Sequence, residues 1–271
     1  MANLNLASDC RTDSCVWSSL RQEAAAHATR EPNLSSLLYG TILERESLEG
    51  ALINHLADRM STGDFNSLKL IRVLKDAVLV DATIIESAAR DLLATFERDP
   101  ACRSYLQAFL YFKGYMAIQV HRCAHALYRD GHELIAFHLQ NRASEQFGVD
   151  INPAAHIGSG IMLDHATGFV MGETAVMGDD CSVLQGVTLG GTGKADEDRH
   201  PKVGNRVLIG AGASVLGNIV IGDDAKIAAG SVVLNPVSEK CTVAGVPAKP
   251  VAGPCVRSPS ETMDQTLEYA T

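Results

Sequence analysis

The chain has 271 residues, enough for one large domain or two moderate ones. Its net charge is −9, from 23 basic and 32 acidic residues, and there is no basic run, which argues against a nucleic-acid partner. No apolar stretch reaches the roughly 18 residues that a membrane helix needs, and the start lacks a signal-peptide core. Seven cysteines without a CxxC pair favour reduced thiols and a cytoplasmic location.

From residue 15 to about residue 147 the hydrophobic period is helical. Apolar residues recur three and four positions apart over 34–56, over 73–93 and from 106 toward 147. The pair Asp99-Pro100 predicts a helix start, with Asp99 as the N-cap and Pro100 as the first helical residue. We expect an all-helical domain over 1–147, which would cap the segment that follows or mediate assembly.

From residue 148 to residue 250 the period changes to six. This spacing belongs neither to a helix nor to an ordinary strand, and it is typical of a parallel β-helix in which three hexads make one coil. The aliphatic residue of each hexad should point inward and stack on its equivalent in the next coil. The inward positions are Ile151, Ile157, Leu163, Met171, Met177, Val183, Leu189, Val203, Ile209, Val215, Ile221, Ile227 and Val233.

The hexad pattern is interrupted twice. Leu163 and Met171 are eight residues apart instead of six, and Leu189 and Val203 are fourteen apart, which is one hexad plus eight residues. The longer insert lies within GGTGKADEDRHPK and cannot pack into a wall of the prism, so we expect a loop that projects from one corner. Loops on rigid scaffolds often carry sites. After residue 250 the sequence is polar and predicts a mobile tail over 251–271.

Histidines beside carboxylates are the best candidates for chemistry in this half. His165 follows Asp164 in the run LDHATG, and His200 ends the projecting loop in DRHP. A histidine general base needs a carboxylate to fix its tautomer, and Asp150 is a further candidate. Each residue also has an ordinary interpretation: an Asx turn for Asp150, and solvated surface for His165 and for Arg199 with His200.

Two other histidine arrangements favour structure over metal binding. His121 and His125 are four residues apart on a predicted helix, but the pattern is not HExxH, so packing is the preferred interpretation. A zinc site built from His156, His165 and His200, as in carbonic anhydrases of β-helical architecture, is the minor alternative. We therefore expect no metal.

Two stretches carry a family resemblance. IMLDHATGFVMGETAV at 161–176 and VTLGGTGKADEDRHPK at 187–202 resemble the signature stretches of bacterial serine acetyltransferases, which are hexapeptide-repeat acyltransferases. The likeness continues to AGVPAKP near residue 250 and upstream to RDPAC at 98–102, so it covers nearly the whole chain. It implies an α+β fold: a helical domain (1–147), a left-handed parallel β-helix (148–250) and a polar tail (251–271). It also implies acetyl transfer from acetyl-CoA to the hydroxyl of L-serine, the first step of cysteine biosynthesis, with L-cysteine as a feedback inhibitor.

The resemblance assigns roles to particular residues. His165 matches the general base, and Asp150 matches the carboxylate that orients it. Arg199 is placed to clamp the serine carboxylate and Asp164 to bind the serine ammonium. The remaining implied positions are Asp99 and His200 as a second His–Asp pair at the amino-acid site, Gly191, Thr192, Ala211 and Ala229 along the pantetheine arm of acetyl-CoA, and Lys226 and Lys249, with Lys194 and Lys202 as further candidates, for its phosphates.

The resemblance also implies assembly. Family members are dimers of trimers, with helical domains that join the trimers and active sites between adjacent β-helices. Many members end in an isoleucine that inserts into O-acetylserine sulfhydrylase, whereas this chain ends in Thr271, which weakens the expectation of that partnership.

Two alternatives compete with the serine acceptor. One is an acetyltransferase with another hydroxyl acceptor, such as homoserine, a sugar or a xenobiotic. Arg199 and Asp164 together favour an amino acid. The other is a non-catalytic scaffold, which the joint presence of His165, Asp150 and His200 disfavours.

Overall fold

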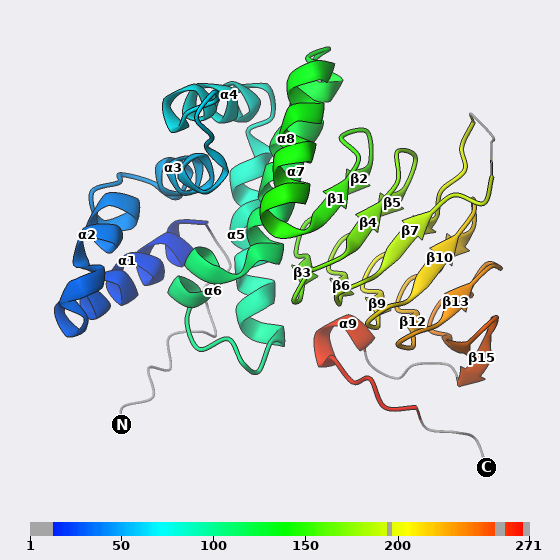
Figure 1. Cartoon of the computed structure of the whole chain (residues 1–271). Coiled ribbons are helices and arrows are strands. Elements are labelled where there is room, and N and C mark those ends of the chain that lie inside the picture. Colours follow the sequence, from blue (N-terminus) through cyan, green and yellow to red (C-terminus); the bar gives the residue numbers. More distant parts are fainter. Residues whose placement is uncertain (1–12, 194–196, 253–257, 268–271) are drawn as a thin grey trace.

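The computed structural model describes residues 13–193, 197–252 and 258–267 (Figure 1). Helices form one half of the molecule, and a parallel β-helix extends from them. None of the helices in the described ranges is long and apolar enough to cross a membrane.

Buried thiols of Cys102, Cys123 and Cys181 are free, but Cys15 is disulfide-bonded, so the expectation of a fully reduced set is wrong at that residue.

The helical half contains more and shorter helices than the three predicted stretches. Polar caps set several boundaries: Ser47, Asn66 and Ser104 each accept a backbone N–H three residues on, and Gly148 ends the last helix in a left-handed conformation (φ 69°). The elements are α1 (Asp13–Arg30), η1 (Pro32–Leu34), α2 (Ser35–Leu38), η2 (Tyr39–Leu43), α3 (Leu48–Met60), α4 (Ser67–Val80), α5 (Thr83–Arg98), α6 (Tyr105–Tyr111), α7 (Lys113–Arg129) and α8 (Glu133–Phe147).

The predicted helix start at Asp99-Pro100 is wrong. Asp99 is the C-cap of α5, and the next helix, α6, begins at Tyr105 with Ser104 as its N-cap. The Asp99 carboxylate accepts the Ala101 N–H at 2.7 Å, which closes an Asx turn that Pro100 favours. The same two residue types that begin a helix therefore end one here.

The β-helix consists of three sheets, and each coil contributes one strand to each sheet in turn. Their strand orders are β1-β4-β7-β10-β13 (sheet A), β11-β8-β5-β2 (sheet B) and β15-β14-β12-β9-β6-β3 (sheet C). All strand pairs are parallel except β14–β15 at the end of sheet C. The strands are β1 (Val149–Ile151), β2 (His156–Ile157), β3 (Met162–Leu163), β4 (Phe169–Met171), β5 (Val176–Met177), β6 (Ser182–Val183), β7 (Thr188–Gly190), β8 (Lys202–Val203), β9 (Leu208–Ile209), β10 (Ser214–Leu216), β11 (Val220–Ile221), β12 (Lys226–Ile227), β13 (Val232–Val233), β14 (Thr242–Gly245) and β15 (Ala248–Ala252).

The register confirms the stacking that the hexads predict. In sheet A the inward column is Ile151, Met171, Leu189, Val215 and Val233, and every member is buried. Corresponding columns run from Ile157 to Ile221 in sheet B and from Leu163 to Val243 in sheet C. Each column buries aliphatic surface against its neighbours above and below, so the core is continuous along the axis.

The helices close the first coil of the β-helix. Asp91 on α5 is fully buried and accepts hydrogen bonds from Gln119 and Arg122 on α7 and from the Ile161 backbone N–H. Arg122 also donates to the Gly158 carbonyl at 2.6 Å. A buried charge is tolerated only when it is paired and hydrogen-bonded, and this network joins two helices to the first coil.

The far end of the β-helix is closed by β15, which pairs with β14 antiparallel. The described part of the predicted tail is attached to the domain. A short helix, α9 (Pro259–Thr262), contacts α5, and the Ser260 carbonyl accepts from Ser182 Oγ at 2.8 Å. The described part of the tail therefore contacts both the helical half and the β-helix. Thr271, which bears on the sulfhydrylase partnership, lies outside the described residues.

Candidate functional site

The corner that leads into β4 carries His165. Its two extra residues form a tight turn in which His165 and Ala166 are both left-handed, with φ of 54° and 60°. Such a conformation is costly for residues with a Cβ and is common at functional sites. The imidazole is 73% exposed, and its Nε2 lies 3.7 Å from an Asp164 carboxylate oxygen. The first interruption of the hexad pattern thus projects a histidine beside a carboxylate.

Asp164 shares this corner electrostatically with Asp99. Burial raises the pKa of the Asp164 carboxyl, the His165 imidazole opposes that rise, and the negative charge of Asp99 adds to it. A cation bound between the two carboxylates would relieve their repulsion and so be stabilised there. The corner is therefore suited to an ammonium group, and the role of Asp164 in binding the serine ammonium stays a prediction.

Asp150 does not contact His165 in the structure. It lies on β1, beside β4 in sheet A, and its Oδ1 accepts from Gln140 Nε2 on α8 at 2.6 Å. The ion pair of His165 is with Asp164 instead. The predicted Asp150–His165 pair therefore stays a prediction. The carboxylate that pairs with the His165 ring belongs to Asp164, its neighbour in the sequence.

The projecting loop returns at a different corner, the one that follows β4. His200 is 7% exposed, and its ring packs over Gly172, where any Cβ would clash with it. Thr174 orders the loop end, because its Oγ1 accepts the backbone N–H groups of Arg199 and His200 at 3.1 and 3.2 Å. Its own hydroxyl proton is then free to reach His200 Nδ1, 2.8 Å away.

These contacts fix the tautomer of His200. Nδ1 also receives the Thr174 backbone N–H at 3.3 Å, so in the neutral ring the proton is on Nε2. Burial lowers the pKa of His200, and the charges of Arg199 and Lys202 lower it further. The neutral ring therefore offers an Nε2–H donor near neutral pH. Sequence reasoning missed Thr174, whose only signal was its place in the GETA run.

Arg199 is held beside His200 by an ion pair. Its Nη2 lies 2.6 Å from Glu173 Oε2, and the Arg199 side chain is about a quarter exposed. Glu173 was not predicted either. A guanidinium has five N–H donors, so this pair leaves donors for a second carboxylate.

The predicted residues for the amino acid thus fall into two groups. Asp99, Asp164 and His165 lie at the corner before β4, while Arg199 and His200 lie at the corner after it. The hexad that contains β4 separates the corners, a distance on the order of 15–20 Å at about 3.3 Å per residue. One chain therefore holds two half-sites at opposite edges of sheet A.

Two of the predicted pantetheine positions continue the His165 corner. Gly186 N–H donates to Thr167 O, Gly212 N–H to Gln185 O, and Gly230 N–H to Ala211 O, so the same corner repeats coil on coil. We call this series the corner column; it consists of Thr167, Gln185, Ala211 and Ala229. It begins at the His165 turn and extends along the axis for three coils.

The other predicted contacts of acetyl-CoA lie elsewhere. Gly191 lies against the Arg199 side chain and Thr192 against Gly217, at the corner of the projecting loop. Lys226 Nζ donates to the carbonyls of Asp264 and Thr266, so the end of the chain occupies it. Lys249 is exposed on β15, and Lys202 Nζ is bound within the loop by Asp198 and two carbonyls, whereas Lys194 lies outside the described residues.

Comparison with known proteins assigns the family. The model of the serine acetyltransferase N-terminal domain matches residues 16–120, and the model of bacterial transferase hexapeptide repeats matches 200–235. A serine acetyltransferase of Salmonella typhimurium is 49% identical over 267 residues, spanning 96% of this chain and 98% of the relative. The chain belongs to the serine acetyltransferase family.

Solved structures of the family agree with the fold. The Neisseria gonorrhoeae serine acetyltransferase superposes with a TM-score of 0.90 at 52% identity, covering 93% of this chain and 97% of its own. Family structures in complex with serine, with cysteine and with CoA give TM-scores of 0.85, 0.92 and 0.84 at 53%, 48% and 49% identity. These three cover 87–94% of this chain and 97–99% of their own chains.

Proposed function

We propose that the chain transfers the acetyl group of acetyl-CoA to the hydroxyl of L-serine, giving O-acetylserine and CoA. The observation that carries this proposal is the pair of half-sites. One offers two carboxylates and an exposed imidazole, and the other offers a guanidinium and a neutral histidine. Together they match an amino acid with a hydroxyl group: carboxylates for its ammonium, a guanidinium for its carboxylate and imidazoles for its hydroxyl.

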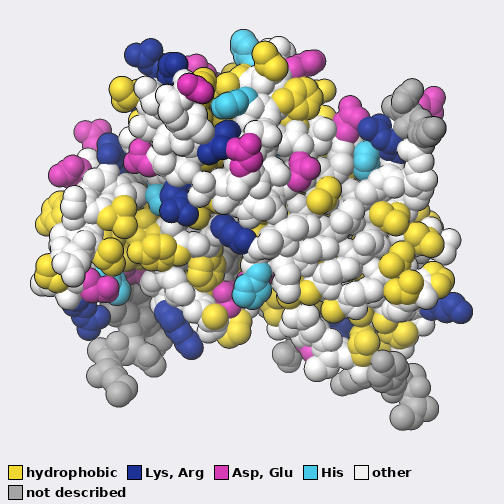
Figure 2. Space-filling model, viewed as in Figure 1, with side chains coloured by type: hydrophobic (Ala, Val, Ile, Leu, Met, Phe, Trp, Pro, Cys, Tyr) yellow, Lys and Arg dark blue, Asp and Glu magenta, His cyan; other side chains and the backbone are white. Residues whose placement is uncertain are grey.

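We further propose that the complete site forms between two chains. Serine is far smaller than the distance between the two corners, so Arg199 and His165 of one chain cannot bind one molecule of it. In a trimer of β-helices, the loop corner of one chain meets the His165 corner of the next. Four apolar side chains of the β-helix are exposed and support such packing: Val170, Val220, Leu234 and Val246. Figure 2 shows hydrophobic side chains on the visible face of the β-helix.

A dimer of trimers is part of the same proposal. Hydrophobic side chains also gather over the opposite end of the molecule, where the first helices lie (Figure 2). Leu37 and Tyr39 are 42% and 50% exposed there. Exposed apolar groups that recur on one surface favour an interface. This end is available to join two trimers through their helices.

The chemistry follows from the exposed imidazole. His165 accepts the proton of the serine hydroxyl as its oxygen attacks the thioester carbonyl carbon. A C–O bond forms, the C–S bond breaks, and the proton passes from His165 to the CoA sulfur. General-base assistance of this kind contributes about 10²–10⁴ in rate. Asp164 and Asp99 bind the ammonium, Arg199 binds the carboxylate, and the Nε2–H of His200 donates to the substrate. Asp150 is proposed to orient His165 when the ring turns from Asp164.

The corner column is the proposed path of the pantetheine arm. It begins at His165, where the thioester must lie. It presents the small residues Ala211 and Ala229, each followed by an exposed glycine, Gly212 and Gly230. Three coils at about 4.8 Å give a track on the order of 14 Å, which suits an extended amide chain. Gly191, Thr192, Lys226 and Lys249 remain proposed contacts of the rest of CoA; Lys226 must first exchange the carbonyls of Asp264 and Thr266.

Cysteine is proposed to inhibit by occupying the serine site. It carries the same ammonium and carboxylate as serine, so the same half-sites would hold it. We also propose a cytoplasmic location, which the free thiols of Cys102, Cys123 and Cys181 support and the disulfide bond at Cys15 does not.

Thiol release from acetyl-CoA, measured with a panel of acceptors, tests the proposed reaction. Serine should give turnover, homoserine and sugars little, and His165→Ala should reduce turnover with serine at least about a hundredfold without loss of folding. Turnover with another acceptor but none with serine would refute the substrate, and near-normal activity of His165→Ala would refute the base.

A further inference from the structure

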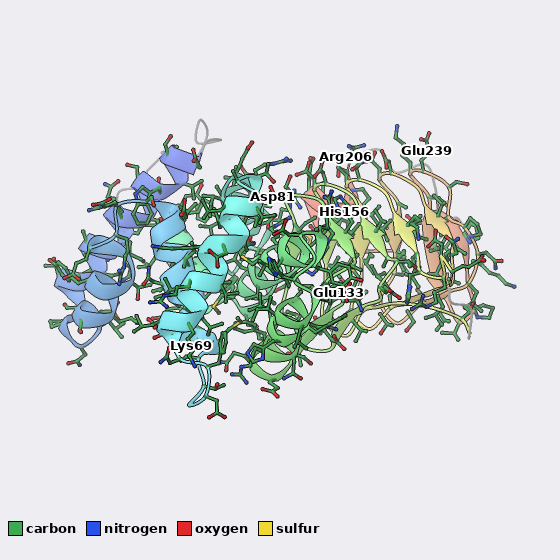
Figure 3. The ribbon with its side chains drawn as sticks, turned by 90° about the horizontal axis from the view of Figure 1, so that it is seen from above. Lys69, Asp81, Glu133, His156, Arg206 and Glu239 are labelled. Carbon is green, nitrogen blue, oxygen red and sulfur yellow. The ribbon has the colours of Figure 1, made fainter. Side chains whose placement is uncertain are left out.

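A polar cavity of about 260 Å³ lies where the helices meet the β-helix, apart from both half-sites. It opens on the edge of the molecule where Asp81 and His156 are seen together from above (Figure 3). Helices α5 and α7 form one wall, and the first two coils form the other. The lining residues are Asp81, Thr83, Ile84, Ser87, His121, Arg122, His125, Arg129, His156, Ile157, Gly158, Ser159 and Asp179.

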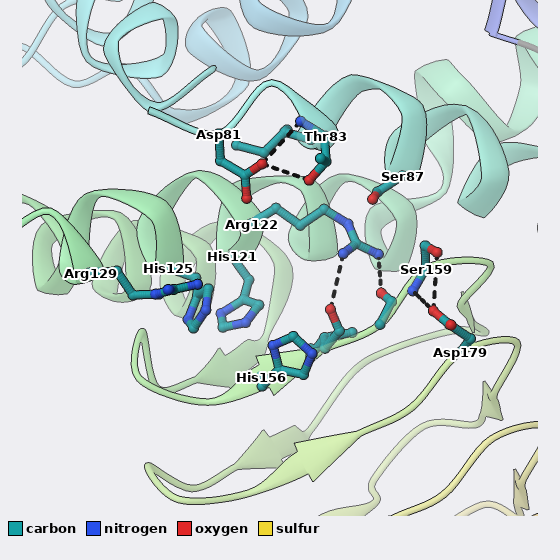
Figure 4. Close-up of a pocket in the computed structure, with 13 residues that line it drawn as sticks. Asp81, Thr83, Ser87, His121, Arg122, His125, Arg129, His156, Ser159 and Asp179 are labelled. Atoms are coloured by element: carbon teal, nitrogen blue, oxygen red, sulfur yellow. Dashed lines mark hydrogen bonds between the residues drawn. The ribbon is translucent and has the colours of Figure 1, made fainter. Parts of the chain in front are cut away.

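Three imidazoles meet in this cavity (Figure 4). The rings of His121 and His125 lie 5.9 Å apart, as do those of His125 and His156. His125 Nδ1 donates to the Pro153 carbonyl at 2.7 Å, which fixes its tautomer. His121 is only 4% exposed, yet its Nδ1 has no hydrogen-bond partner. Buried polar atoms are almost always paired, so the unpaired nitrogen is unusual.

The carboxylates around the cavity are already engaged. Asp81 accepts from the Thr83 backbone N–H and hydroxyl, at 3.0 and 2.6 Å. Asp179 accepts from the Ser159 backbone N–H at 2.7 Å and from its hydroxyl at 3.1 Å. The charge of Arg122 is balanced by Asp91, as described above. These hydrogen bonds hold the walls together and occupy oxygens of both carboxylates.

The cationic and donor groups are not engaged in this way. Within the described part of the chain, the Arg129 guanidinium, the His156 ring and the Ser87 hydroxyl make no hydrogen bond or ion pair. Figure 4 shows Arg129 beside His125. Burial lowers the pKa of His121 well below its usual value, and the neighbouring charges of His125 and Arg122 add to that effect. Burial also lowers the pKa of His125, with His156 and Arg129 contributing.

A metal ion does not fit this cluster well. Among the described residues, no group of three histidine, cysteine or acidic side chains is placed to hold a metal ion. The guanidinium of Arg129 would repel a cation. An anion fits the cavity better than a cation. It would accept hydrogen bonds from Arg129 and Ser87, and it would favour protonated imidazoles.

We propose that this cavity is a binding site for a small multivalent oxyanion, of the sulfate, phosphate or dicarboxylate type. Arg129 and His156 bind it at the mouth, and the Ser87 hydroxyl donates to it. Binding takes up protons, because a bound anion raises the pKa values of His121 and His125 above their lowered values. Affinity should therefore increase as the pH falls from about 7.5 toward 6.

Calorimetric titration of the whole chain with sulfate, phosphate and malonate tests the site, at constant ionic strength maintained with chloride. We expect saturable binding of at least one of them, with proton uptake detected in buffers of different ionisation enthalpy. Comparison of sulfate and phosphate with malonate shows whether the site prefers an inorganic tetrahedral anion or an organic dicarboxylate. Arg129→Gln and His156→Gln should each weaken binding about tenfold, and both residues are exposed, so folding should persist.

Arg30→Gln is the matched control. Arg30 is exposed and is the last residue of α1, as Arg129 is of α7, so both variants remove the same helix-end charge. Arg30→Gln should bind like the unmodified chain, and Arg129→Gln should keep full serine-dependent turnover. Heats that do not saturate, or that are equal in all three variants, would overturn the proposal. So would Zn²⁺ binding that His156→Gln abolishes and Arg129→Gln leaves intact.

Discussion

Mixed trimers of two inactive variants test whether the site is shared between chains. His165→Ala removes the proposed base at one edge of sheet A, and Arg199→Ala removes the carboxylate clamp at the other edge. A seam here is the contact between the His165 corner of one chain and the loop corner of the next. Each variant alone leaves every seam defective. In an equal mixture, a seam is intact when an Arg199→Ala chain supplies the His165 corner and a His165→Ala chain supplies the loop corner. Random assembly makes about one quarter of the seams intact in a cyclic trimer.

The assay is thiol release at low serine concentration after the two chains are co-expressed or unfolded and reassembled together. His165→Ala alone should retain about 1% of the activity or less, and Arg199→Ala about 1–10%, since a charge-assisted pair is worth roughly 1.5–3 kcal/mol. The mixture should approach about 25%. Mixing His165→Ala with Asp164→Asn is the control, because both changes lie at the same corner. That mixture should not exceed the mean of its parents.

Native mass spectrometry can show whether mixed trimers are present. A shared site is refuted if they are present and the activity of the first mixture still stays at the mean of its parents. That result would mean that His165 and Arg199 do not serve one site, or that they serve it within a single chain.

Other predictions concern binding, positioning and stability. The KM for serine should rise as the pH falls through the raised pKa of Asp164, since only the charged carboxylate binds ammonium, and Asp99→Asn should move that rise to lower pH; an unmoved profile would contradict their coupling. Thr174→Val should lower kcat/KM about 10–100-fold by freeing His200, and Thr174→Ser should restore it; equal activity of both variants would exclude this positioning role. Ile209→Ala should lower the free energy of unfolding by about 2–5 kcal/mol in denaturant titration, and a loss below about 1 kcal/mol would contradict the packed inward column.

The hexad period allowed the β-helix to be predicted because each inward residue is determined by its own position in the repeat. Ile209 stacks on Val183 and Ile227 without any information from outside the repeat. The same regularity located the two inserts, and with them His165 and the loop that ends at His200. Periodicity could not locate residues that depend on where a loop returns.

The functional residues that the sequence did not indicate make contacts that depend on where a distant segment returns. Thr174 binds residues 25 and 26 positions later, and His156 joins a cluster with two histidines on a helix more than thirty residues earlier. Nothing local distinguishes these side chains from ordinary corner residues. Asp99 was misread for a different reason: aspartate followed by proline suits either end of a helix, and only the packing of α5 on the first coil decides between them.

The corner column also sets fixed distances along the axis of the β-helix. Every coil adds the same rise, so the distance from His165 to any outer binding contact is set by the number of coils between them. A chain that lacked one whole coil beyond β10 would keep both half-sites and shorten the track by about 4.8 Å. Thioesters with arms of different length would then discriminate the two proteins, although no residue that touches serine had changed.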